Sequence, residues 1–159
     1  MPNAIKLLLA TLALAAPIAA QQAVQAVWSR GGFETISGPA GNEMGHSSGF
    51  TILDQDGNEI YSNAYPGDYA PCQMNGHTFT LSGGCFSAPF KFACTSKFDG
   101  NPKNCEVLDS SGNSLGKADG NTKTNFNGIS ISEDGTCSVG FTLGPNDHCG
   151  PNTSGFNVS

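Results

Sequence analysis

The sequence predicts an all-β fold: a disulfide-stabilised β-sandwich or β-barrel. Three observations favour it, namely short segments of alternating apolar and polar residues, Asp-Gly and Asn-Gly pairs between those segments, and six cysteines among 159 residues. Alternation places the apolar side chains on one face of a strand, and Asx-Gly pairs tolerate the positive φ of tight hairpin turns. Many short strands separated by such turns are typical of sandwiches and barrels. The predicted turns are at Asp56-Gly57, Asn75-Gly76, Asp99-Gly100, Asp119-Gly120, Asn127-Gly128 and Asp134-Gly135.

Residues 1–20 have the order of a secretory signal peptide. Lys6 supplies a positive charge, an apolar run follows as far as Ala16, and small residues precede Gln21. The apolar run is shorter than the ~20 residues that cross a bilayer. We therefore expect cleavage at the end of this segment and a single secreted, extracellular domain over residues 21–159.

The charge balance limits the partners of the expected domain. The formal net charge of the whole chain is −6, and removal of Lys6 makes it more negative by one. Binding of nucleic acid or of anionic lipid requires a surplus of Lys and Arg that this chain lacks. We expect no nucleic-acid partner, no membrane insertion and a monomer.

The cysteines predict three disulfides, because an even number in a small secreted chain is typical of a disulfide framework. Zinc binding is disfavoured, since even the nearest two cysteines are separated by eight residues, whereas zinc sites use closely spaced ligands. We expect neither a metal nor a cofactor. The pairing stays open among Cys72, Cys85, Cys94, Cys105, Cys137 and Cys149.

Alternation predicts individual strands, and glycine-rich segments predict the connections. Residues 37–49 are rich in Gly and Ser and are expected to form a loop, as is the tail over residues 144–159. Asn152 in that tail begins an N-glycosylation sequon and is a candidate glycosylation site, whereas the sequon at Asn157 lies very near the end. The expected strands cover residues 24–28, 33–36, 50–54, 77–81, 129–132 and 138–143.

The chain also contains an internal similarity. Residues 52–60 and 107–115 share Leu, Asp, Gly and Asn at equivalent places, and residues 75–85 resemble 127–137 with three residues fewer in between. One interpretation is a fold built from two duplicated hairpin units that pack face to face. The other is convergence, because Asp-x-x-Gly-Asn is favourable turn chemistry between any two strands.

Two enzyme classes match short motifs. Residues 45–49 spell the G-x-S-x-G of a nucleophile elbow around Ser47, but that chemistry needs a turn from a strand into a helix, and a strand is expected to follow here. A secreted ribonuclease needs a His and a Glu with a basic residue to hold phosphate. The chain offers His46, His77, His148 and Arg30 for those roles.

Clustered carboxylates and aromatic residues suggest three further possibilities. Asp54, Asp56 and Glu59 resemble a glycosidase pair or a calcium loop, but Asp is also an ordinary turn former and the spacing does not fit an EF-hand. A ligand-stacking platform is the other candidate, against ordinary strand packing. Its candidate contact residues are Trp28, Tyr61, Tyr65 and Tyr69.

The signal segment, the Gln-Gln-Ala start, the expected disulfides and the Gly/Asn/Ser-rich β body together resemble the small secreted cysteine-rich proteins of filamentous fungi. Within that class the chain is most similar to apoplastic effectors and elicitors of plant cell death. The resemblance implies a non-enzymatic extracellular protein that acts on a host protein, receptor or glycan without a cofactor. It fixes no site residue. The alternatives are a carbohydrate- or cell-wall-binding module and, third, a small secreted hydrolase or ribonuclease.

Overall fold

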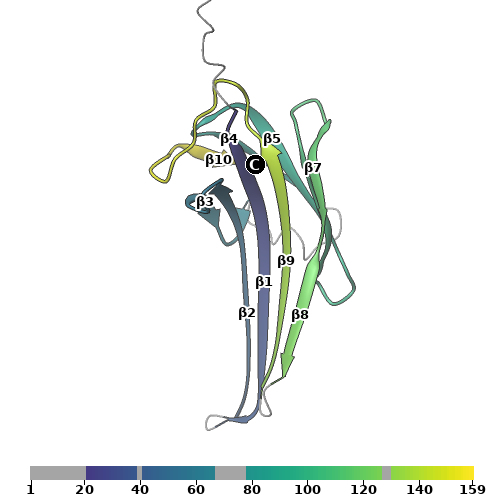
Figure 1. Ribbon diagram of the computed structural model, residues 1–159. Coiled ribbons are helices and arrows are strands. Elements are labelled where there is room, and N and C mark those ends of the chain that lie inside the picture. The colour runs from purple at the N-terminus through teal and green to yellow at the C-terminus, as the bar shows by residue number, and fades with distance from the viewer. Residues whose placement is uncertain (1–20, 39–40, 67–77, 127–129) are drawn as a thin grey trace, which may run out of the picture.

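The computed structural model describes residues 21–38, 41–66, 78–126 and 130–159. Within them the chain forms two five-stranded antiparallel sheets (Figure 1). Sheet A has the order β3-β2-β1-β9-β8 and sheet B the order β10-β4-β5-β6-β7. Neither sheet closes on itself, so the fold is the predicted disulfide-stabilised sandwich rather than the barrel.

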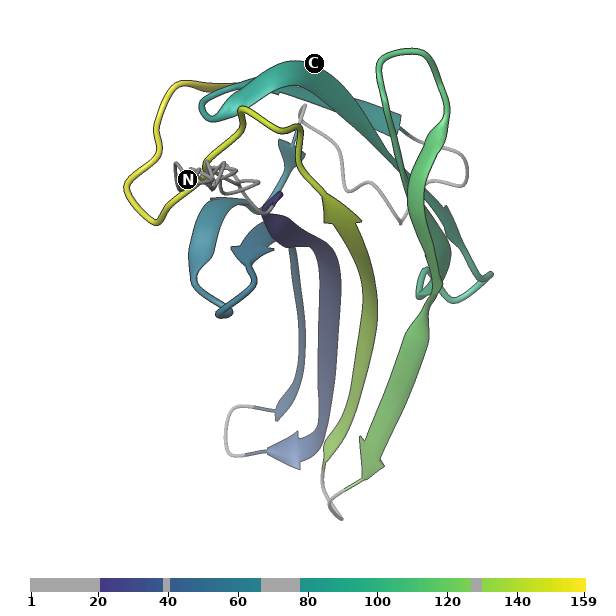
Figure 2. The same ribbon diagram turned by 45° about the horizontal axis from the view of Figure 1, so that its top comes forward.

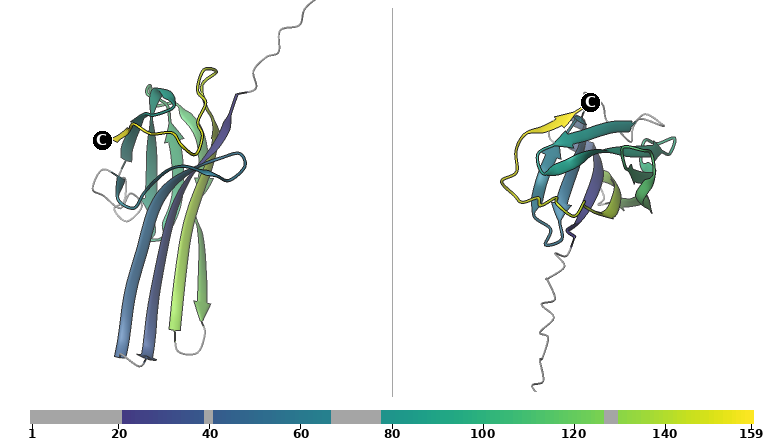
Figure 3. Two further views of the ribbon diagram at one scale, coloured as in Figure 1. Left: turned by 90° about the vertical axis from the view of Figure 1, so that its left-hand side faces the viewer. Right: turned by 90° about the horizontal axis from the view of Figure 1, so that it is seen from above.

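Sheet A comprises β1 (Ala23–Gly38), β2 (Gly41–Asp54), β3 (Glu59–Asn63), β8 (Asn121–Phe126) and β9 (Ser130–Thr142). Sheet B comprises β4 (Thr78–Gly83), β5 (Phe86–Ser96), β6 (Pro102–Leu108), β7 (Ser114–Asp119) and β10 (Phe156–Val158). The long strands β1, β2 and β9 continue well past the shorter sheet B (Figure 3). No helix long and apolar enough to cross a bilayer occurs in the part of the chain that the structure describes.

The core lies between the inner faces of the two sheets, where alternate residues are buried as the sequence predicts. Phe50 and Ile52 on β2 are fully buried, and the alternating pair Phe79 and Leu81 on β4 is buried as well. Phe50 is at the centre, with ring-centroid distances of 4.7 Å to Phe79 and 4.9 Å to Phe92. Alternation identifies this core because successive side chains on a strand point to opposite faces.

Three expected breaks in the chain are absent. The two strands expected around residues 30–32 are one strand, β1, and residues 41–49 of the expected loop belong to β2, which pairs with β1 from Gly41 onward. β9 likewise runs through the expected turn at Asp134-Gly135. The tail also contains a short strand, β10, which pairs with β4. The expected turns at Asn75-Gly76 and Asn127-Gly128 lie outside the described residues.

Gly135 illustrates why the turn prediction is wrong. A Cβ added to this glycine would lie 2.6 Å from Asn101 Oδ1 and 2.7 Å from Pro102 Cδ, on the other sheet. Gly135 therefore permits close packing between the sheets and does not supply a turn conformation. Asn101 and Pro102 are both fully buried at this contact.

Gly116 and Gly120 lie along the same edge of the sandwich. Gly120 is the single residue between β7 and β8, where the chain passes from sheet B to sheet A (Figure 2). Its N–H donates to Lys103 O at 2.8 Å, and an added Cβ would lie 1.9 Å from Pro102 O. A Cβ added to Gly116 would lie 2.4 Å from Gly140 O of β9. We call Gly116, Gly120 and Gly135 the glycine seam.

Two disulfides connect segments that are distant in the sequence. Cys105–Cys137 joins β6 to β9 across the glycine seam, with a Cα–Cα distance of 6.2 Å. Cys85–Cys149 ties the β4–β5 turn to the C-terminal segment at 5.1 Å. Cys94 is disulfide-bonded as well, and Cys72 lies outside the described residues. The prediction of a disulfide-stabilised domain is therefore confirmed for these bridges.

Each sheet contains a run of consecutive strands that pair side by side. Read from one edge, sheet A begins β3-β2-β1-β9, and sheet B begins β7-β6-β5-β4. In sheet A the fourth strand, β9, comes from the C-terminal half of the chain, whereas the four strands β4 to β7 of sheet B are consecutive in the sequence. The second part of the internal similarity is not matched in space: Cys85 lies in a turn, whereas Cys137 lies inside β9.

The glycine seam predicts a strong effect of a small substitution. Gly120→Ala is expected to destabilise the protein by about 3 kcal/mol, because its Cβ meets backbone that cannot rotate away. Gly140→Ala is the matched control, since no atom lies within 4 Å of its added Cβ. Urea unfolding followed by circular dichroism measures both. Equal stability of the two variants would show that the seam relaxes freely.

Candidate functional site

Among the described residues, three hairpin turns have the same backbone closure. In each, the first residue donates its N–H to the fifth residue and accepts from the N–H of the fourth, a glycine with positive φ. In each of these hairpins the strand pairing shifts by one residue just before the turn, between the last two residues that precede it. The turns are 54–58 between β2 and β3, 97–101 between β5 and β6, and 109–113 between β6 and β7.

Of the carboxylate candidates, Asp54 acts within the first of these turns, whereas the side chains of Asp56 and Glu59 are exposed. Asp54 Oδ1 accepts from the backbone N–H groups of Asp56 and Asn58 at 2.9 and 2.8 Å, and Oδ2 accepts from Asn58 Nδ2 at 3.0 Å. Asp109 has the equivalent bonds to Ser111 and Asn113, at 2.8, 2.8 and 2.9 Å. The Asp54 carboxylate thus closes the β2–β3 turn, as expected of an ordinary turn former.

These bonds lower the pKa of both carboxyl groups. The side-chain hydrogen bond from Asn58 is the largest cause of the lowered pKa of Asp54, and Asn113 has that role for Asp109. The pKa of Asp99 is also lowered, chiefly by the Asn101 N–H. The stability these groups contribute is fully present above the ordinary value of 3.8 and is lost as the pH falls through the lowered pKa.

Arg30, the candidate phosphate ligand of a ribonuclease, lies over the third turn. Its Nη1 donates to Asp99 O, and a Cβ added to Gly100 would lie 2.7 Å from Nη1. The guanidinium therefore links β1 to the β5–β6 turn. Of the histidines, His148 is exposed, His77 lies outside the described residues, and His46 is in a stretch for which only the backbone is described.

Residues 45–49, the candidate nucleophile elbow, lie inside β2. Ser47 pairs with Gly31 of β1 in the antiparallel register, so the motif is part of a strand and does not turn into a helix. In the described residues no group of three or more His, Cys, Asp or Glu side chains is placed to hold a metal ion.

Of the four aromatic candidates for ligand contact, Trp28 is buried in the core, and Tyr61 and Tyr65 are at least partly exposed. Trp28 has no exposed surface and lies in the core, and among the described residues its Nε1 has no hydrogen-bond partner. Tyr61 is half-buried and packs on Phe156, with ring centroids 5.1 Å apart. Tyr65 is 57% exposed, and Tyr69 lies outside the described residues. Trp28 and Tyr61 thus pack as ordinary strand residues. Asn152 is exposed.

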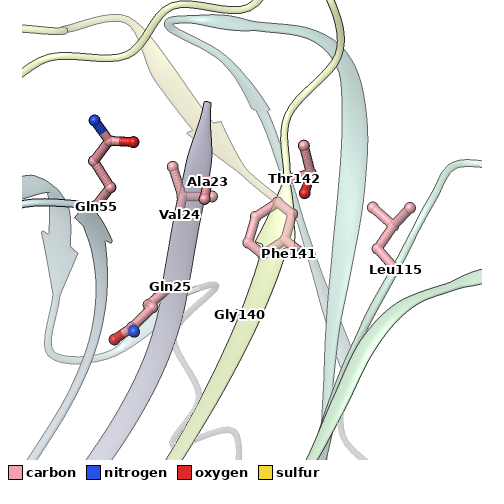
Figure 4. A pocket seen from close by; sticks show the side chains of 8 residues that line it. All are labelled: Ala23, Val24, Gln25, Gln55, Leu115, Gly140, Phe141 and Thr142. Carbon is pink, nitrogen blue, oxygen red and sulfur yellow. The ribbon is translucent and has the colours of Figure 1, made fainter. Parts of the chain in front are cut away.

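Two adjoining depressions lie where β1 begins and β9 ends. The first, which we call the glutamine hollow, has a volume of about 560 Å³ (Figure 4). Phe141 and Thr142 of β9 lie between the β1 side chains and Leu115. The amides of Gln25 and Gln55 lie on the side of β1 away from Leu115. Its lining residues are Ala23, Val24, Gln25, Gln55, Leu115, Gly140, Phe141 and Thr142.

The second depression, the phenylalanine hollow, has a volume of about 260 Å³ and shares Leu115, Phe141 and Thr142 with the first. Its charged lining residues are Asp109 and Asp147. Asp147 is buried and accepts from the N–H groups of Ser87 at 2.9 Å and Gly144 at 3.3 Å. The apolar lining residues are Phe86, Ala88, Pro89, Phe90, Leu115, Phe141 and Leu143.

Sequence reasoning missed both hollows and one exposed residue, Phe98. The hollows are assembled from separate segments, so no local pattern marks them. Phe98, which is fully exposed, had a signal: it occupies the second position of its turn, where the other two turns have Gln55 and Ser110. Comparison of this chain with family models, curated proteins and solved structures gives no match.

The turn geometry predicts separate titration of two carboxyl groups. Asn58→Ala is expected to raise the pKa of Asp54 toward 3.8, because it removes the hydrogen bond with the largest effect. Asp109 should keep its lowered pKa in that variant, and Asn113→Ala should produce the converse result. Carboxyl ¹³C chemical shifts followed against pH measure both groups. An Asp54 pKa that stays low in Asn58→Ala would contradict the assigned cause.

Proposed function

We propose that this chain is a non-enzymatic binding protein that acts outside the cell, in the manner of a fungal apoplastic effector or an elicitor of plant cell death. Its partner would be a host extracellular protein, receptor or glycan. The proposal combines the resemblance of the sequence to small secreted cysteine-rich proteins with the chemistry of the described carboxylates.

The observation that carries the proposal is the use of those carboxylates. Asp54, Asp99 and Asp109 each accept backbone N–H groups within a turn, and the pKa of each is lowered. A general acid needs a pKa near the working pH, which for a carboxyl group means a raised value. These side chains are therefore suited to holding loops in shape, which is what a binding surface requires.

The bridges support the same interpretation. Cys85–Cys149 and Cys105–Cys137 hold the C-terminal segment and the two sheets in fixed positions. Preorganised loops bind with a smaller entropy cost than mobile ones. Disulfides persist in oxidising compartments, in agreement with an extracellular site of action.

Infiltration of the purified protein into leaves tests the proposal. The intact protein is expected to cause cell death or a defence response, and a Cys105→Ser/Cys137→Ser double variant to lose it, because loss of this bridge costs about 2–4 kcal/mol. Esterase and ribonuclease assays of the same preparation, with Ser47→Ala and His77→Ala as controls, test the enzymatic alternative. Turnover that a single substitution abolishes would refute the proposal.

Carbohydrate binding is the second candidate, favoured by the glutamine hollow. Gln25 and Gln55 place amide groups beside the apolar Val24 and Phe141, and amides can donate to and accept from sugar hydroxyls.

Retention on chitin, cellulose and glucan tests this candidate. Gln55→Ala is expected to weaken retention several-fold, whereas Tyr65→Ala, which alters an exposed ring that does not line the hollow, should leave it unchanged. No retention of the wild-type protein on any of the three polymers would eliminate the candidate.

A further inference from the structure

Asp147 is a buried carboxylate that has no cationic partner among the described residues. Its side chain is 6% exposed and accepts from the N–H groups of Ser87 at 2.9 Å and Gly144 at 3.3 Å, and the described part of the chain gives it no other side-chain bond. A carboxylate has about four acceptor positions, so roughly half of this capacity is unused. Buried charges in proteins are normally paired or bound to a cation. The fold thus holds a negative charge that is only partly compensated.

The surroundings of Asp147 select the sign of a ligand. Asp147 lines the phenylalanine hollow, and none of the described residues that line it is a Lys or Arg. Asp109, the other charged residue of the lining, has a lowered pKa because Asn113 donates to it, so it is ionised at neutral pH. The whole chain has a formal net charge of −6, which adds a field of the same sign. A cationic group is therefore attracted to the hollow, and an anionic group is repelled.

The rest of the wall is apolar and selects the body of the ligand. The ring centroid of Phe90 lies 4.8 Å from that of Phe86 and 5.2 Å from that of Phe141, so three rings of β5 and β9 form one continuous surface. Leu115 of β7 also lines the hollow and is 42% exposed, so it is accessible from solvent. A concave apolar surface with a few convergent polar groups is typical of small-molecule sites.

A metal ion does not suit this chemistry. Hard cations take six or more oxygen ligands, and in the described residues no group of three or more His, Cys, Asp or Glu side chains is placed to hold a metal. An organic ammonium group needs only a few acceptors, and its carbon skeleton can cover the apolar wall.

We propose that the phenylalanine hollow binds a small organic cation in which a primary ammonium group is carried on an apolar body. The ammonium group donates to the unused acceptor positions of Asp147, and the apolar body packs on Phe90, Phe141 and Leu115. The volume of about 260 Å³ exceeds the roughly 150 Å³ that accommodates benzene in an engineered cavity, so one aromatic ring with a short alkylammonium chain fits. The inference goes beyond the proposed function and does not depend on it.

Three ligands of similar shape and different charge test the site. The secreted full-length product is titrated with phenethylammonium, phenethyl alcohol and hydrocinnamate, and ¹⁵N NMR spectra follow the N–H signals of Ser87 and Gly144, the donors to Asp147. Phenethylammonium is expected to shift both signals with a Kd of about 0.1–1 mM. The neutral alcohol should bind at least about tenfold more weakly, because it lacks the charge-assisted hydrogen bond. The anion should produce no shift.

Variants at Leu115 change the charge of the wall without altering the core, because this side chain is exposed. Leu115→Lys is expected to weaken binding of phenethylammonium at least about fivefold relative to Leu115→Glu, since the two variants lose the same apolar contact and differ in charge.

Asp147→Asn removes the partner of the ammonium group and should weaken binding at least about tenfold. Asp134→Asn is the matched control: it removes one exposed carboxylate roughly 23 Å from Phe141 along β9, and should bind as the wild type does. Circular dichroism checks that all variants fold alike.

Three results overturn the proposal. One is phenethyl alcohol that binds as tightly as phenethylammonium, because the hollow then selects apolar surface alone. The second is an absence of shifts at Ser87 and Gly144 up to about 10 mM phenethylammonium, a concentration at which millimolar affinity is visible. The third is equal affinity of Leu115→Lys and Leu115→Glu. Because no host partner, polysaccharide or leaf response enters these measurements, their failure is distinct from failure of the proposed function.

Discussion

The sandwich depends on the close approach of its two sheets along the glycine seam. Residues 101–102, which lead into β6, are fully buried between Gly120 and Gly135, where an added Cβ would meet backbone or buried side-chain atoms. Protein interiors are packed to crystal-like density, so a methyl group at such a place displaces a whole strand. The bridge Cys105–Cys137 crosses the same edge and restricts the separation that would relieve the contact. Glycine and sulfur thus act on one constraint: glycine permits the approach and the disulfide preserves it.

The end of the sandwich where β1 begins and β9 ends is held by segments near both termini of the described chain. Gln22 uses both atoms of its side-chain amide on the backbone of Cys149, at 2.8 Å each, and its carbonyl accepts from Leu143 N–H. Cys149 in turn is bridged to Cys85 in the β4–β5 turn. The side-chain amide of Gln22 thus makes the two hydrogen bonds to the Cys149 backbone that a neighbouring strand would otherwise make. The hollows lie beside these ties, so their walls are anchored by the residues that join the termini to the core.

The sequence predicted the sandwich, its alternating core and the turns closed by Asp and Asn, because each is a local property. Residues 50–54 show which side of β2 is buried, and Asp-x-x-Gly-Asn shows how the strand turns. The same reasoning failed at Asp134-Gly135 and Asp119-Gly120. Glycine there permits contact with residues that are distant in the sequence, and a local pattern cannot distinguish close approach from a turn.

The candidate site was harder to predict for the same physical reason. Leu115 and Phe141 line a common wall only after β7 and β9 have come together, and nothing around either residue indicates the other. Trp28 was expected to contact a ligand because a large aromatic residue suits both a core and a binding surface, and burial decides between them. Phe98 was predictable in principle, by aligning its turn with the two similar ones.

The repeated turn separates the requirements of folding from those of binding. The glycine with positive φ and the Asn that follows it recur in all three turns, and an Asp closes each through backbone N–H groups. The second position takes part in none of these bonds, and it holds Gln55, Phe98 and Ser110 in the three cases. A side chain there can change in size and polarity at little cost to stability, because exposed substitutions away from such bonds alter it by less than about 0.5 kcal/mol. The tips of these hairpins are therefore the places where this scaffold can acquire new contacts while its core and its seam stay fixed.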